Sequence, residues 1–201
     1  MTATPPTPGP TPGPTPGQTV GPFFHDALPW PGDAELVPPG RAEAVRLHGV
    51  VRDGAGDPVP DALVELWQVG PDGRVVQRPG SLRRDGHTFT GFGRCATDRA
   101  GSYSFTTLLP GPHADGAAPF VALTVFARGL LHRLLTRAYL PEGRGGTAEA
   151  LAADPLLSAL DDAGRATLVC DVDGDALRRD LVLQGPGETV WLTYPRLPHG
   201  G

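Results

Sequence analysis

The stretch VRLHGVVRDGAGDPVPDALVELWQV, from Val45 to Val69, decides the fold class of this chain. Its first part alternates along VRLHGVVRD and stops at the glycine- and aspartate-rich sequence Asp53–Asp57, which is typical of a turn. A second strand-like run follows over Asp61–Val69. Trp67 in this run, and Phe105 further along the chain, are large apolar residues that we expect in the core.

The same strand signal recurs along the rest of the chain. Short apolar or alternating runs occupy residues 92–98, 102–111, 118–129 and 134–140, a closing hairpin is predicted around DGD at 173–175, and ETVWLTY at 188–194 is a candidate edge strand. The only helical pattern, Thr147–Gly164, is short and broken by Pro155. Turns at intervals of about 8–12 residues predict an all-β fold, an antiparallel β-sandwich over residues 45–201 with one short helical insert.

The N-terminal part has a different composition. Residues 1–17 repeat the unit TPGP and have almost no apolar side chains to bury, so we expect a flexible Pro/Gly-rich arm with some polyproline character. Residues 18–44 bring Phe23, Phe24 and Trp30 in close succession between prolines. This pattern predicts an extended interface arm without regular secondary structure, anchored by its aromatic side chains on its own domain or on a partner.

Composition excludes several functions. The 17 basic residues are all arginine and there is no lysine, which excludes Schiff-base lysine and P-loop chemistry. The net charge is −5 and no basic run exceeds two residues, so nucleic-acid binding is not expected. No apolar run approaches the length of a membrane span, and no signal peptide is apparent at the N-terminus.

Cys95 and Cys170 lie far apart, each in an apolar, strand-like run. Reduced, buried thiols in a cytoplasmic protein are the favoured interpretation, and a single disulfide is the alternative.

The sequence contains few signs of a self-contained active site. The six histidines have no metal-ligand spacing and no neighbouring cysteine or carboxylate cluster, so a zinc or iron site built from this chain alone is not expected. No serine has a nucleophile-elbow setting. GFGRCA at 91–96 matches a dinucleotide-binding pattern only formally, because a second strand and not a helix follows it. The residues alone therefore favour a binding or assembly module over an enzyme.

Four motifs together resemble the intradiol ring-cleavage dioxygenases. They are TPGQTVGPFFH at 15–25, the run Leu47–Val75, GFGRCATDRAGSYSFTTLLPG at 91–111 and VFARGLLHRLLTRAYLPE at 125–142. The similarity covers roughly residues 14–194, with the motifs in the family's order and spacing. It is closest in character to the alpha subunits of those members that assemble from alpha and beta subunits.

This resemblance implies a β-sandwich and chemistry at a non-haem Fe(III) that two tyrosines and two histidines of the beta subunit hold. The equivalent positions in this chain are Val75, His113, Phe120 and Ala122. Since a lone loop histidine cannot replace that ligand set, the resemblance implies that this chain binds no metal itself and that Fe(III) belongs to the partner beta subunit.

The resemblance also implies that Thr19, Gly21, Pro22 and Arg128 of this chain line the partner's site. Gly21 would allow close backbone approach, Pro22 would direct the arm, and Arg128 would bring a permanent positive charge toward an anionic catecholic substrate. The implied reaction inserts both atoms of O2 into 3,4-dihydroxybenzoate to give 3-carboxy-cis,cis-muconate in the beta-ketoadipate pathway. Large hetero-oligomers of αβ pairs are typical of such proteins.

Alternatives stay open for each of these residues. Arg128 could pair only with an acidic group at the subunit interface, Thr19 could only satisfy the backbone of the arm, and Gly21-Pro22 could be a simple turn. Arg133 and Arg137, close to Arg128, are expected at a rim or in a salt bridge. For the whole chain, the alternatives are a stand-alone β-sandwich binding module and a metalloenzyme that uses His113.

Overall fold

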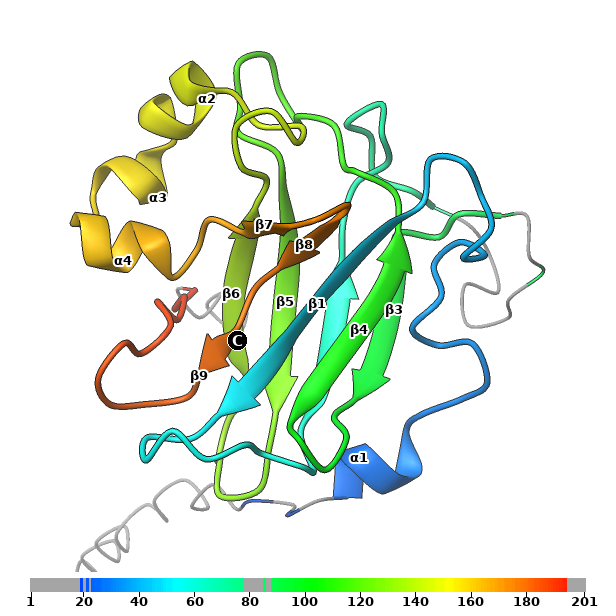
Figure 1. Ribbon diagram of the computed structural model, residues 1–201, viewed down its shortest axis with the longest axis vertical. Coiled ribbons are helices and arrows are strands. Elements are labelled where there is room, and N and C mark those ends of the chain that lie inside the picture. The colour runs from blue at the N-terminus through cyan, green and yellow to red at the C-terminus, as the bar shows by residue number, and fades with distance from the viewer. Residues whose placement is uncertain (1–18, 20, 22, 78–84, 86–87, 195–201) are drawn as a thin grey trace, which may run out of the picture.

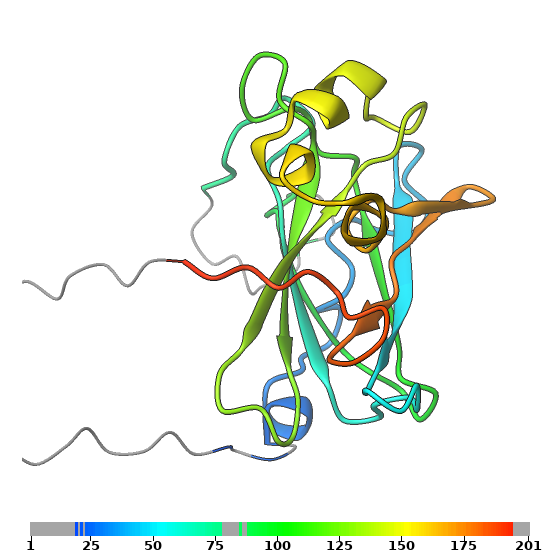
Figure 2. The ribbon, with the colours of Figure 1, turned by 90° about the vertical axis from the view of Figure 1, so that its left-hand side faces the viewer.

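The computed structural model describes residues 19, 21, 23–77, 85 and 88–194, and in it two β-sheets pack face to face (Figures 1 and 2). The first sheet has the order β4-β1-β8-β7, with β9 also paired to β1, and the second has the order β3-β2-β5-β6. The strands are β1 Val45–Arg52, β2 Leu63–Trp67, β3 Phe92–Ala96, β4 Ser102–Thr107, β5 Phe120–Phe126, β6 Leu134–Tyr139, β7 Asp171–Asp173, β8 Ala176–Arg178 and β9 Leu181–Val182. The predicted β-sandwich is confirmed, but the first sheet is mixed, because β8 and β9 run parallel to β1.

The core lies between the sheets and follows the period of two that the sequence shows. Leu47, Gly49 and Val51 of β1, and Val121 and Leu123 of β5, are buried, while the residues that alternate with them are partly accessible. Phe105 on β4 is completely buried, as predicted.

The prediction for Trp67 is wrong. Its side chain is 41% exposed at the end of β2, whereas Val64 and Leu66 on the same strand are completely buried. Successive side chains of a strand point to opposite faces. Because the Leu66 side chain points into the core, the Trp67 side chain points to the outer face of its sheet. Sequence alternation alone could not decide which face the second sheet would cover.

The helical insert consists of three short helices, α2 Ala148–Ala153, α3 Pro155–Ser158 and α4 Asp162–Ala166, which lie together at one edge of the sandwich (Figure 1). Thr147, Asp154 and Asp161 cap their N-termini, and the predicted break at Pro155 is the first residue of α3. No helix in the described ranges is long and apolar enough to cross a membrane.

The described part of the N-terminal arm departs from the expectation of irregular structure. Phe23–Ala27 forms a short helix, α1, at the lower end of the sandwich in Figure 1. Six residues lie between Pro22 and Pro29, which leaves room for one helical turn. Phe24 packs on Phe126 with ring centroids 4.8 Å apart, and this contact orients the turn. The expected flexible segment 1–17 lies outside the described residues.

The C-terminal part confirms one prediction and corrects another. β7 and β8 form the predicted hairpin around Gly174. The candidate edge strand at 188–194 does not form a regular strand. The Thr189 amide donates to the Val182 carbonyl, and the Leu192 amide donates to the Leu135 carbonyl, so this segment crosses from β9 to β6.

Candidate functional site

Arg128 stands in the connection between β5 and β6. The turn closes with a hydrogen bond from the Leu130 amide to the Ala127 carbonyl, and Gly129 adopts a positive φ of 83°. The Arg128 Nε lies 2.6 Å from Asp61 Oδ2, and the arginine side chain is 63% exposed while that of Asp61 is 12% exposed. The ion pair therefore anchors Arg128 within its own chain and leaves much of the guanidinium accessible.

Thr19 joins the N-terminal arm to this same turn. Its Oγ1 accepts hydrogen bonds from the Gly129 amide at 3.2 Å and from the Gly21 amide at 3.3 Å. Gly21 has a φ of 63°, in the left-handed region that favours glycine. Three of the residues implied by the family resemblance, Thr19, Gly21 and Arg128, thus come together; we call them, with Gly129, the arginine corner. Pro22 lies outside the described residues.

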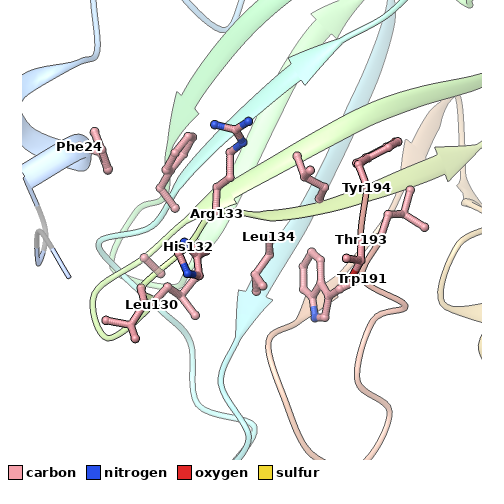
Figure 3. A pocket seen from close by; sticks show the side chains of 13 residues that line it. Phe24, Leu130, His132, Arg133, Leu134, Trp191, Thr193 and Tyr194 are labelled. Carbon is pink, nitrogen blue, oxygen red and sulfur yellow. The ribbon is translucent and has the colours of Figure 1, made fainter. Parts of the chain in front are cut away.

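An open apolar groove of about 920 Å³ runs beside the arginine corner (Figure 3). Its apolar lining includes Phe24, Phe126, Leu130, Leu131, Trp191 and Tyr194, and we call it the aromatic groove. Phe24 lies at one end of the groove and Trp191 and Tyr194 lie at the other. Leu130 follows Gly129 directly, so the groove and the arginine corner share a border.

The positions that the resemblance equates with the family's iron ligands lie elsewhere on the sandwich. The centroids of the His113 and Phe120 rings lie 5.7 Å apart, with the rings edge to face. Ala122 lies two residues further along β5. Val75, in the loop after β2, is 55% exposed. Valine, phenylalanine and alanine side chains have no donor atom for a metal, so this set does not fit the iron that the family uses.

Arg137 occupies the neighbourhood of those positions. It pairs with Ala122 across β5 and β6, and its guanidinium carbon lies 4.2 Å from the centroid of the Phe120 ring. Its Nη1 donates to the Tyr139 hydroxyl at 2.9 Å, and that hydroxyl donates to Asp154 Oδ1 at 3.0 Å. A fixed cation therefore lies beside the ligand-equivalent residues. Only the strand register reveals this arrangement. Arg137 is half-buried, and among the described residues its contacts are with Tyr139 and Phe120 and not with an ion-pair partner.

Both cysteines are free thiols. Burial raises the pKa of the Cys170 thiol to about 12, and it also raises the pKa of the half-buried Cys95. Among the described residues, no group of three or more histidine, cysteine or acidic side chains could hold a metal ion. The thiols thus have a structural rather than a reactive environment.

We expect Cys170 to resist thiol reagents in the folded chain. At pH 8 a thiol with a pKa of about 12 is only about one part in 10,000 thiolate, which is the reactive form. A Cys95→Ser variant isolates Cys170, and reaction with a chromogenic disulfide before and after denaturation measures the difference. Rapid modification of the folded variant would contradict this assignment.

Comparison with known proteins identifies the family of this chain. Residues 21–129 match the family described as "Dioxygenase". The chain is 38% identical to the protocatechuate 3,4-dioxygenase alpha chain of Burkholderia cepacia, over 74% of this chain and 76% of the relative. It is 30% identical to the beta chain of the same enzyme from that organism, over 73% of this chain and 67% of the relative.

The fold agrees as well. The dioxygenase domain of a carbohydrate-binding fusion protein from Streptomyces sp. SirexAA-E superposes with a TM-score of 0.56 at 24% identity, covering 87% of this chain and all of that domain. The chain belongs to the intradiol ring-cleavage dioxygenase family. Within that family it is homologous to the alpha chains of protocatechuate 3,4-dioxygenase.

Proposed function

We propose that this chain is the alpha subunit of a protocatechuate 3,4-dioxygenase and completes a site whose iron a beta subunit holds. The complex would cleave 3,4-dihydroxybenzoate with O2 to 3-carboxy-cis,cis-muconate. The observation that carries the proposal is that the metal donors are missing while the residues expected to line the partner's site lie together. The ligand-equivalent residues Val75, Phe120 and Ala122 have no metal donors, whereas Thr19, Gly21 and Arg128 remain assembled.

The arginine corner has the chemistry for this role. The substrate carries a carboxylate and two ionisable hydroxyls, and Arg128 offers a charge that persists at any working pH. The ion pair with Asp61 is made through Nε, and the arginine side chain is 63% exposed, so much of the guanidinium is accessible to a ligand. We propose that Arg128 orients the substrate or tunes the site electrostatically, while Thr19 holds the arm against the turn.

The family depends on non-haem iron. We expect the chain purified alone to contain no stoichiometric iron and to be colourless, since its donor set is incomplete. Co-expression with the homologous beta chain should give a stable αβ complex with iron and protocatechuate-oxidising activity. Metal analysis and visible absorption spectra measure both. One equivalent of tightly bound iron with a tyrosinate-to-iron absorption band in the isolated chain would overturn the proposal.

The proposed role as an alpha subunit also leads to a proposal for the assembly and the cell compartment. We propose a large assembly of αβ pairs in the cytoplasm. The homology of this chain to both alpha and beta chains supports the pairing, and two free thiols are usual in a reducing compartment.

A further inference from the structure

The aromatic groove has no role in the proposed function. Leu131 and Tyr194 on its lining are 57% and 58% exposed. Its polar lining residues within the described chain are His132, Arg133 and Thr193, with no carboxylate among them. Exposed apolar patches of this kind mark sites where another segment or molecule binds.

The N-terminal sequence contains a segment that suits such a groove. From Thr4 to Pro16, every residue is either a proline or directly precedes one. Proline fixes its own φ, and it drives the preceding residue away from the helical region, so both effects favour an extended polyproline II helix. The segment carries no charged side chain. Grooves lined by aromatic side chains recognise polyproline II helices, which lose little conformational entropy on binding.

Thr19, the first described residue of the chain, lies beside the groove. The Thr19 hydroxyl accepts a hydrogen bond from the Gly129 amide, and the next residue, Leu130, lines the groove. Phe24 packs on Phe126 at the same end of the groove, opposite Trp191 and Tyr194 (Figure 3). Only Gly17 and Gln18 separate Pro16 from Thr19.

We propose that residues 4–16 bind along the aromatic groove of their own chain as a polyproline II helix. At about 3.1 Å per residue the segment is about 40 Å long, enough to extend from the arginine corner toward Tyr194. Because a two-residue linker tethers it, the segment is present at an effective concentration of millimolar order or higher. Weak contacts with single prolines are then sufficient to cover Leu131 and Tyr194.

The test uses the full chain without any partner, so its outcome is independent of the proposed dioxygenase function. Incorporation of 5-fluorotryptophan labels Trp30, Trp67 and Trp191, and only Trp191 lines the groove. The test variant replaces Pro8, Pro10, Pro12 and Pro14 by serine. The matched control replaces Thr7, Thr11 and Thr15 by serine and keeps every proline.

We expect the Trp191 fluorine resonance to shift in the proline variant and to become more sensitive to exchange of H2O for D2O. Trp30 and Trp67 should not change, and neither should any resonance of the threonine control. A peptide of residues 1–17, added in millimolar amounts, should restore the Trp191 resonance of the proline variant. Leu131→Ser, on the exposed lining, should shift the wild-type resonance in the same direction as the proline variant.

Three results would overturn the inference. The first is an unchanged Trp191 resonance in the proline variant. The second is a wild-type Trp191 resonance that depends on protein concentration, which would assign the groove to a second copy of the chain. The third is a resonance that responds only when the beta chain is added, which would assign the groove to that partner.

Discussion

Arg128→Ala, in a complex reconstituted with the beta chain, is expected to lower the turnover of protocatechuate by a factor on the order of 100, as for the loss of one preorganised charge or donor at a reacting centre. Assembly and iron content should stay near normal, because Arg128 is 63% exposed and its only described ion pair joins it to Asp61 of the same chain. Steady-state oxygen consumption and metal analysis of the purified complex measure the two effects separately.

Two further variants sharpen this test. Arg99→Ala removes an exposed arginine from the turn between β3 and β4 and should leave turnover unchanged. Asp61→Asn keeps the shape of the partner but removes its charge, so Arg128 loses part of its orientation and a smaller decrease is expected. Full activity of Arg128→Ala would mean that this arginine has no role toward the ligand. Loss of the complex would instead assign Arg128 to the subunit interface.

Phe105→Ala is expected to lower the free energy of unfolding by about 3–5 kcal/mol, as for other buried aromatic residues truncated in a core. The Phe105 side chain is completely buried, and its ring packs against Tyr103 with centroids 6.0 Å apart. Removal of the ring leaves a cavity between the two sheets. Unfolding in urea, followed by circular dichroism, measures the loss.

Trp67→Ala is the matched control for the same measurement. Trp67 is the larger side chain, but it is 41% exposed on the outer face of β2. Its removal opens a surface position to water and creates no closed cavity, so its cost should be less than half that of Phe105→Ala. Equal losses for the two variants would place Trp67 in the core and contradict the structure.

Much of the sandwich could be predicted from local sequence. The alternation of apolar residues located β1 and β4, and a nearly continuous apolar run located β5. Glycine- and aspartate-rich turns marked several strand ends. All of these signals arise from neighbours in the chain. The helical insert was also visible, although its division into α2, α3 and α4 depends on separate caps at Thr147, Asp154 and Asp161.

Other features depend on contacts that no local pattern encodes. The short helix α1 forms where Phe24 meets Phe126 on another element. Arg137 reaches Phe120 only because β6 pairs with β5 in a particular register. The exposure of Trp67 follows from which face of β2 the other sheet covers, and sequence alternation is identical for either choice.

The sequence by itself determined which chemistry this chain can offer. The absence of donor atoms at Val75, Phe120 and Ala122 is a property of the side chains, whatever their arrangement. Only the tertiary structure decided that Thr19 would meet Gly129, 110 residues away, and that Asp61 would anchor Arg128. Those contacts form because the packing of the arm and the strands brings distant residues within hydrogen-bonding distance, and sequence separation carries no information about that distance.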